Sequence, residues 1–478
     1  MKKIIISKLF LYKHRFVIGY VLLGLAFISL LFTLPLFAQY GVSEDEINSV
    51  TSSYALKFDA PLNGDLVDLP YRVLQKISVM LFGLTPYAIK LPSIIIGLLL
   101  GFLFVLLLNR WFKNNVSLLA SFLVILSTPF LFLAGSGTPL IMLVFWPTLL
   151  LWLGSKIQGE NRPKPMYSFL FAITLLLAIY TPYMIYFAVF CVFFVFLQPH
   201  LRFILKSLPK LPLALILLLI LGGVAALIVN IFTHPNTIME LLFAKDYSVG
   251  NFFGNIINGL GPVFSWRNAT ENVYLSPLMS LPLFALALIG LFSTTKGFFA
   301  SRNSIASLLL VFTIVITGFD SDAVIFFILP LSILVAHGLK YLLEKWYGLF
   351  PENPYARVAA ALPLSILFAT ILIPSTLQYI YGYRYNPSVA GLFNYNLDVI
   401  HENLTNETLL VKDHYDFYKI LERHTEIKVI NEIGKEKYPS FAAMGRLEVP
   451  ESYQLTRIIT SPMRENSDII YLYTEKGE

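Results

Sequence analysis

The residues in this sequence best suited to chemistry are acidic and follow the first long apolar run. Glu44, Asp45 and Glu46 are consecutive in AQYGVSEDEINSV (residues 38–50), in a chain with only 13% charged residues. A carboxylate held at a membrane boundary and partly removed from water can accept a proton from a hydroxyl group, while a nearby cation stabilises a leaving anion. The alternative is a solvated acidic loop with Asp45 or Glu46 near a helix N-terminus, where the helix dipole favours negative charge.

Cations that could complete such a site are expected on the same side of the membrane: Arg72, Lys76, Lys90, Lys245, Arg267 and Arg384. Each could instead extend toward lipid headgroups, as long basic side chains at membrane surfaces do.

A second acidic pair, Asp320 and Asp322 in TGFDSDAVIFF, lies in a tight turn expected between two apolar runs. It could bind an acceptor or a metal ion, or it could cap the following helix, because Ser321 and Asp322 are good N-cap residues. The sequence shows no His/Cys/Glu set with metal-ligand spacing and no Ser/His/Asp motif. The metal requirement stays unknown, and a divalent cation remains open.

The composition is that of an integral membrane protein. Of 478 residues, 56% are hydrophobic and 15% aromatic, whereas a soluble domain has about a quarter charged residues. The net charge of +6 comes from Lys and Arg in short clusters between apolar runs, which set topology and leave no basic patch for nucleic acid. The single cysteine, Cys191, lies within an apolar run and excludes an intramolecular disulfide.

Runs long enough to cross about 30 Å of hydrocarbon predict about eleven transmembrane helices, near residues 16–38, 88–108, 116–134, 139–153, 167–181, 183–197, 212–232, 278–293, 304–319, 323–343 and 358–380. The Lys/Arg-rich loops alternate with poorer ones, which predicts a multi-pass membrane protein with a cytoplasmic N-terminus. The acidic loop and the C-terminal tail are then on the outer side.

Two outer regions, the first outer loop and the C-terminal tail, are too large to be connectors. Within the transmembrane domain (1–383), the first outer loop (39–87) has roughly helical apolar spacing in EDEINSVTSSYALKF and LPYRVLQKISVMLFG, which predicts two juxtamembrane helices. A second large outer loop covers 233–277. The tail (384–478) alternates the strand-like TLLVKD, IKVINE and DIIYLY with helix-like segments, which predicts a small outer α/β domain.

Three stretches together resemble the GT-C superfamily of polytopic glycosyltransferases: YGVSEDEIN after the first span, then LFGLTPYAIKLPSIIIGLLLGFLFVLLLNRWF, then STPFLFLAGSGTPLIMLVFWPTLLLWL. The likeness is to the protein O-mannosyltransferase and aminoarabinose-transferase-like branch, over residues 15–155 and more loosely 258–292. It implies a GT-C-like fold and an enzyme that moves a sugar from a polyprenyl-phosphate donor to a hydroxyl acceptor at the outer face, usually with inversion.

The resemblance also implies roles for individual residues. The acidic pair of the family falls on Asp45 and Glu46, with Asp45 as the general base and Glu46 as its supporting partner. Lys90 matches the basic residue of the family at the start of the second span. The expected partner of the donor phosphate is Arg267 in the first place, and Lys90 or Arg72 in the second.

Two other functions stay open. A catalytically inactive scaffold or lipid-binding relative is favoured by Leu140, because many family members have an acidic residue near this position. A lipid or solute transporter would instead have two matching halves and charged or broken segments at the bilayer midplane, whereas the charges here lie near the ends of the spans.

Overall fold

The computed structural model describes residues 10–33, 41–57, 66–158, 165–242, 251–264, 277–297, 300–350, 355, 359, 361–385, 392, 393, 395, 397–404, 408–433, 438–447, 449–460 and 469–476.

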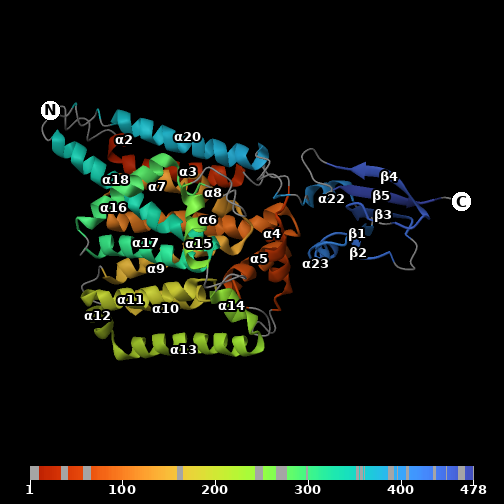
Figure 1. Cartoon of the computed structure of the whole chain (residues 1–478), viewed down its shortest axis with the longest axis horizontal. Coiled ribbons are helices and arrows are strands. Elements are labelled where there is room, and N and C mark those ends of the chain that lie inside the picture. The colour runs from red at the N-terminus through yellow and green to blue at the C-terminus, as the bar shows by residue number, and fades with distance from the viewer. Residues whose placement is uncertain are drawn as a thin grey trace.

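Apolar helices make up most of the described chain and lie side by side in one bundle (Figure 1). Seven are long and apolar enough to cross a membrane: α3 (Arg15–Thr33), α6 (Pro86–Trp111), α9 (Met142–Gln158) with its preceding turn, α13 (Lys210–Thr233), α17 (Ser301–Phe319), α18 (Ile328–Leu349) and α20 (Ala361–Tyr385). Helices α7 (Asn114–Ile125) and α8 (Thr128–Gly135) are together long and apolar enough for one more span, but they are bent by 62° relative to each other, as in a broken span or a re-entrant loop.

Three shorter apolar helices complete the bundle: α10 (Pro165–Ala178), α11 (Met184–Leu197) and α16 (Leu281–Thr295). All eleven predicted spans fall on these helices, which confirms the prediction of a polytopic helical protein. Helices of 14 or 15 residues rise only about 21–23 Å, so these three are shorter than the hydrocarbon layer of about 30 Å.

Helix α18 lies at the centre of the bundle. Its residues are buried continuously from Ile328 to Leu339, as expected of a helix that is apolar all round. It crosses α16 where two glycines face each other's backbone: a Cβ on Gly290 would lie 1.9 Å from the Leu334 carbonyl oxygen, and one on Gly338 would lie 2.0 Å from that of Leu286. Small residues at this crossing let the two backbones touch.

Two helices lie across one end of the bundle, as the first-loop pattern predicts (Figure 1). Helix α4 (Glu44–Ala55) starts at a capping box, in which the Ser43 side chain accepts from the Glu46 N–H and the Glu46 side chain accepts from the Ser43 N–H. Helix α5 (Leu69–Phe82) ends at Gly83, whose φ of 74° is one that glycine adopts without strain.

The remaining described helices are short or lie at the ends of the bundle: α2 (Phe10–Lys13), α12 (Pro199–Lys206), α14 (Asn236–Leu242), α15 (Phe252–Phe264), α22 (Leu397–Asn403), α23 (Tyr415–Tyr418), and the 3₁₀ turns η3 (Pro139–Ile141), η6 (Ser321–Phe327) and η7 (Leu421–Arg423).

The C-terminal region contains a five-stranded mixed sheet in the order β2-β1-β3-β5-β4. Strands β1 (Thr408–Leu410), β2 (Lys428–Ile430) and β5 (Ile470–Glu475) fall on the three predicted strands. Strands β3 (Ser440–Met444) and β4 (Tyr453–Ile459) were not predicted. Strand β1 pairs in parallel with β2 and β3, whereas β5 pairs antiparallel with β3 and β4, so the expectation of a small α/β domain is confirmed.

This domain packs directly on α4 and the α5–α6 corner. One buried cluster joins the two parts: Val42, Ile47, Val50, Val79, Leu84 and Ile89 on one side, and Leu397, Ile400, Leu404, Leu409, Val411, Phe417 and further domain residues on the other. We call it the α4–domain cluster. Polar contacts at its edge include a backbone bridge between Val42 and Tyr395 and a 2.9 Å bond from Arg423 to the Tyr54 hydroxyl.

Truncation of Phe417 tests whether this cluster holds the domain in place. Phe417 is fully buried in the cluster, and Phe→Ala changes in well-packed cores cost about 3–5 kcal/mol. We expect Phe417→Ala to lower the temperature at which a protease begins to cleave the C-terminal domain. Leu455→Ala, at a position 47% exposed on β4, is the control and should leave that temperature nearly unchanged; equal effects of the two changes would contradict the packing role.

Candidate functional site

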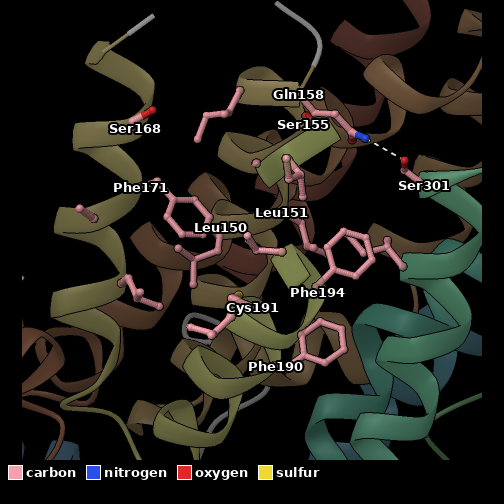
Figure 2. Close-up of a pocket in the computed structure, with 18 of the residues that line it drawn as sticks. Leu150, Leu151, Ser155, Gln158, Ser168, Phe171, Phe190, Cys191, Phe194 and Ser301 are labelled. Atoms are coloured by element: carbon pink, nitrogen blue, oxygen red, sulfur yellow. Dashed lines mark hydrogen bonds between the residues drawn. The ribbon is translucent and has the colours of Figure 1, made fainter. Parts of the chain in front are cut away.

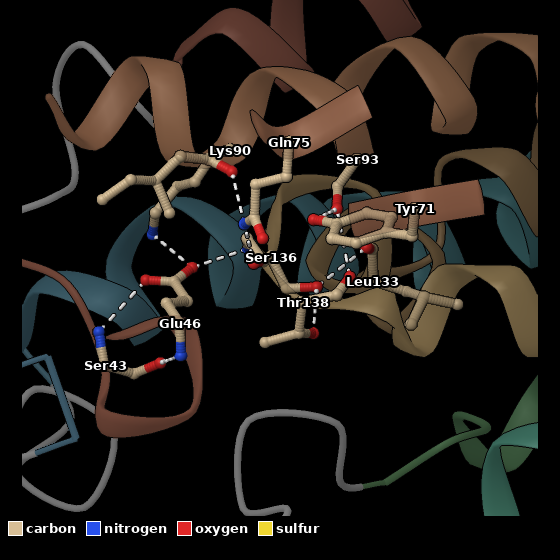
Figure 3. Close-up of polar contacts among 11 residues, drawn as sticks. Ser43, Glu46, Tyr71, Gln75, Lys90, Ser93, Leu133, Ser136 and Thr138 are labelled. Atoms are coloured by element: carbon tan, nitrogen blue, oxygen red, sulfur yellow. Dashed lines mark hydrogen bonds and ion pairs between the residues drawn. The ribbon is translucent and has the colours of Figure 1, made fainter. Parts of the chain in front are cut away.

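A buried ion pair lies where α4 meets the start of α6. The Lys90 ammonium is 3.0 Å from Glu46 Oε1, and the two side chains are 0% and 2% exposed. Glu46 Oε1 also accepts a 2.7 Å bond from the Gly137 N–H, and Oε2 accepts a 3.1 Å bond from the Ser43 N–H. Figure 3 shows these contacts converging on the carboxylate. A cation and two N–H donors offset the loss of water that a buried carboxylate suffers.

The local sequence explains why these groups meet. The capping box fixes the Glu46 side chain against its own helix start. Helix α6 begins at Thr85, whose Oγ1 accepts a 3.1 Å bond from the Ala88 N–H, so Lys90 stands in the first turns of that helix. The Phe393 ring, in the segment before the C-terminal domain, lies 4.8 Å from the Lys90 ammonium, which adds a cation–π contact.

Gln75 on α5 links four elements around the pair. Its Oε1 accepts bonds from the α4 hydroxyls of Ser49 (2.8 Å) and Ser53 (2.7 Å). Its Nε2 donates to the carbonyl oxygens of Ile89 on α6 (3.2 Å) and Gly137 in the turn after α8 (2.8 Å). A fully buried amide with both ends bonded specifies how these elements pack, because a misplaced neighbour would leave one of its groups unpaired.

A second short network ties α5 and α6 to the same turn (Figure 3). The Tyr71 and Ser93 hydroxyls are 2.8 Å apart, and Ser93 Oγ donates to the Thr138 carbonyl oxygen at 3.2 Å. Burial raises the pKa of the Tyr71 phenol above its ordinary value, more than the bond with Ser93 lowers it. Tyr71 is therefore a neutral packing and hydrogen-bonding residue here.

The structure separates the consecutive carboxylates. Glu44 and Asp45 are exposed in the first turn of α4, whereas Glu46 is 1% exposed. Asp45 is thus displayed next to an acid that is fixed inside the protein, at the end of the bundle that faces the C-terminal domain.

The predicted phosphate partners lie in different surroundings. Lys90 is buried against Glu46 and Phe393, so its ammonium is covered by protein in this conformation. Arg72 is partly exposed in the first turn of α5. Arg267 lies outside the described residues. Lys76, another cation of the first loop, donates to the carbonyl oxygens of Tyr54 and Leu56 at the end of α4.

The second acidic pair follows the last residue of α17, Phe319. Asp320 is partly buried and accepts a hydrogen bond from the Tyr183 hydroxyl. The side chain of Asp322 lies outside the described part of the chain. Within the described residues no group of three or more His, Cys, Asp or Glu side chains is placed to hold a metal ion.

Gln75, Gly137 and Ser43 were not identified as site residues from the sequence. The S-x-x-E spacing of Ser43 and Glu46 is a capping-box signal that would have assigned a structural role to Glu46. Gln75 and Gly137 carry no such signal, because their partners come from other helices.

The buried pair can be measured by a double-mutant cycle. Glu46→Gln or Lys90→Met alone leaves one buried charge without its partner and should cost about 3–5 kcal/mol of stability, read from unfolding of the purified protein in a denaturing detergent. The double variant should cost clearly less than the sum. The partly exposed Lys419–Glu422 pair is the control cycle, with a coupling of about 0–1 kcal/mol; additive losses at Glu46 and Lys90 would show that the pair is not coupled.

Gly137→Ala tests the close approach of the turn to the ion pair. The added Cβ would lie 2.7 Å from Ile89 Cγ2 and 3.1 Å from Glu46 Oε1, so we expect a loss of about 1–3 kcal/mol from overpacking in the same assay. Gly222→Ala on α13, where the Cβ meets nothing within 4 Å, should be neutral or stabilising. Wild-type stability of Gly137→Ala would mean that this turn is not tightly packed.

Comparison with known proteins gives a partial family match. Residues 70–225, less than half of the chain, match the family described as dolichyl-phosphate-mannose-protein mannosyltransferase. No curated protein matches the chain by sequence.

Solved structures give matches over most of the chain. The archaeal oligosaccharyltransferase AglB from Archaeoglobus fulgidus, in complex with an inhibitory peptide and a dolichol-phosphate, has a TM-score of 0.56 at 13% identity, over 88% of this chain but only 65% of its own. ArnT from Cupriavidus metallidurans bound to undecaprenyl phosphate has a TM-score of 0.53 at 13% identity, over 95% of this chain and 98% of its own. The chain therefore shares the fold of these two proteins, as the resemblance to GT-C proteins implies.

Proposed function

We propose that the protein is a glycosyltransferase that takes a sugar from a polyprenyl-phosphate carrier and transfers it to a hydroxyl acceptor, with inversion. The observation that carries this proposal is the contrast between two adjacent acids: Glu46 is locked in a buried ion pair, while Asp45 is exposed one residue away. Acids in such different environments commonly take different roles at one site. The similar structures support the donor class, because two of them hold dolichol-phosphate or undecaprenyl phosphate.

In this proposal Asp45 is the general base. It accepts the proton of the acceptor hydroxyl as the hydroxyl oxygen bonds to the anomeric carbon, and the bond from that carbon to the phosphate oxygen breaks. The electron pair of the broken bond leaves with the polyprenyl phosphate. Glu46 supports Asp45 indirectly, because its ion pair with Lys90 holds the first turn of α4 in place.

Cations near this end of the bundle then stabilise the leaving phosphate. Arg72, in the first turn of α5, and Arg267 are the residues we assign to this role. Lys90 acts through Glu46, because its ammonium is enclosed by Glu46 and Phe393. Asp320, held by Tyr183, and Asp322 remain candidates for binding the acceptor or a divalent cation.

We place this end of the bundle at the outer face of the plasma membrane. Basic residues concentrate at the opposite end: Arg110 and Lys156 lie in the last turns of α6 and α9, α12 ends at Lys206, and Arg302 lies in the first turn of α17. Excess Lys and Arg mark the cytoplasmic side of membrane proteins. The C-terminal domain would then lie outside the membrane next to α4.

One assay distinguishes this function from an inactive scaffold or a transporter. Purified protein is mixed with a radiolabelled polyprenyl-phosphate sugar and crude envelope acceptor, and transferred label is counted. We expect Asp45→Asn to lower the transfer rate by roughly 10²–10⁴-fold, the usual contribution of a general base, with unchanged unfolding behaviour because the side chain is exposed.

Glu44→Gln is the matched control, since Glu44 is also exposed in the first turn of α4 and should keep near wild-type transfer. Transfer by the wild type that survives Asp45→Asn unaltered would exclude Asp45 as the base. If no donor sugar supports transfer by the wild type, the protein is better explained as a catalytically inactive relative. The apolar Leu140, at a position where many family members have an acid, also favours that function.

A further inference from the structure

A large cavity lies in the half of the bundle farthest from α4. It has a volume of about 580 Å³ and is lined by residues of α6, α9, α10, α11, α12, α13 and α17. That size is typical of ligand pockets. None of the residues of the Glu46 site lines it.

The cavity is polar at one end and apolar at the other. Figure 2 shows Ser155, Gln158, Ser168 and Ser301 at one end, and Phe190, Cys191 and Phe194 at the other. Arg110 and Arg302 also line it, and no acidic residue is among the described residues that do. Gln158 Nε2 donates a 2.7 Å bond to Ser301 Oγ across the polar end.

Arg302 is a cation of the cavity wall that the protein holds in place. One of its terminal nitrogens donates to the Trp111 carbonyl oxygen, and its guanidinium lies 5.2 Å from the centre of the Phe112 ring. Its Nε is buried and has no hydrogen-bond partner among the described residues. Glu344 on α18 interacts with Arg302 electrostatically but does not line the cavity. Within the described part of the chain no acidic side chain lines the cavity beside Arg302, so an anionic ligand there would gain charge-assisted contacts with the part of the guanidinium that lines it.

The depth of the cavity fits the tail of a lipid from one leaflet. Its walls run from Gln158 to Leu150 on α9, from Ser168 to Leu175 on α10, and from Leu213 to Ile220 on α13. At 1.5 Å per residue these stretches are about 10–12 Å long, less than half the hydrocarbon thickness of about 30 Å. The walls start at the bundle end and stop near its middle.

We propose that this cavity binds one anionic phospholipid from the leaflet at the basic end of the bundle. The phosphate lies against Arg302 and Arg110, and an acyl chain fills the apolar part beside Cys191 and Phe190. Basic pockets between transmembrane helices on the cytoplasmic side are a known way to hold anionic headgroups. Exposed Arg202 and Lys206 on α12 and Lys210 at the start of α13 add positive potential near Leu201, the α12 residue that lines the cavity.

The polyprenyl phosphate of the proposed reaction is a different ligand at a different place. In the proposed reaction its phosphate lies near Asp45, at the α4 end of the bundle. Arg302 lies in the first turn of α17, at the opposite end of the bundle. The phospholipid site does not depend on the proposed enzymatic function, and its test uses no sugar donor.

The test is lipid retention by the full-length protein. The protein is reconstituted in nanodiscs that contain equal amounts of phosphatidylglycerol and phosphatidylcholine with matched acyl chains. It is then released into detergent, and the mass of the protein with its bound lipids is measured by native mass spectrometry. We expect one phosphatidylglycerol to stay bound at an occupancy on the order of tenfold above phosphatidylcholine, as one charge-assisted hydrogen bond can supply. Arg302→Gln should remove this preference, and Cys191→Trp should remove the bound lipid by filling the tail region.

Arg202→Gln is the control, because Arg202 is exposed on α12 and does not line the cavity; it should retain the lipid. Arg110→Gln, at an exposed position, tests the headgroup contact should Arg302→Gln fail to fold. Equal retention of the two lipids by the wild type, or retention unchanged in Cys191→Trp, would overturn the proposal. A competition experiment could also overturn it. If added undecaprenyl phosphate displaces phosphatidylglycerol from the wild type, and Cys191→Trp no longer binds undecaprenyl phosphate, the cavity binds the sugar carrier instead of a phospholipid.

Discussion

The buried ion pair between Glu46 and Lys90 is the constraint on which the arrangement of the α4 end depends. Two charges with 2% or less exposure are expensive to remove from water, and their attraction offsets that cost only when their other hydrogen-bonding positions are also satisfied. Glu46 meets this condition through the N–H groups of Ser43 and Gly137. Those donors belong to the start of α4 and to the turn after α8, so the pair forms only when both are in place.

The same condition connects the first loop to the C-terminal domain. Phe393 covers the Lys90 ammonium, and two residues later Tyr395 pairs with Val42, next to the cap of α4. A cation–π contact is worth most when it is removed from water, so the segment that leads into the domain strengthens the pair by enclosing it. The α4–domain cluster also buries Ile47 and Val50 of α4, and Val50 lies one turn after Glu46 on the same face. Polar and apolar contacts thus hold the same side of α4, which fixes the direction in which Asp45 is displayed.

The parts of this structure that follow from local patterns could be predicted from the sequence. Long apolar runs located the helices, and period-two or compact apolar segments located β1, β2 and β5. Strand β3 was missed because SFAAM is short and weakly β-forming. Strand β4, YQLTRII, contains β-forming residues, but its alternation of apolar and polar residues breaks at Thr456 and Arg457, where its pairing with β5 is irregular. The acidic stretch could be identified, but Glu46 could be separated from Asp45 only by its contacts with Lys90 and Gly137, which come from distant parts of the chain.

Rigid helices separate the two chemically distinct ends of the bundle. Helix α6 has Lys90 in its first turns and Arg110 in its last, and twenty residues of helix between them span about 30 Å. Over that distance direct electrostatic interaction between exposed charges is screened by salt. A lipid held near Arg110 and Arg302 could therefore influence Asp45 only by moving a whole helix. The close contact of α16 with α18 at Gly290 and Gly338 opposes such movement at the centre of the bundle, so the two ends should act independently.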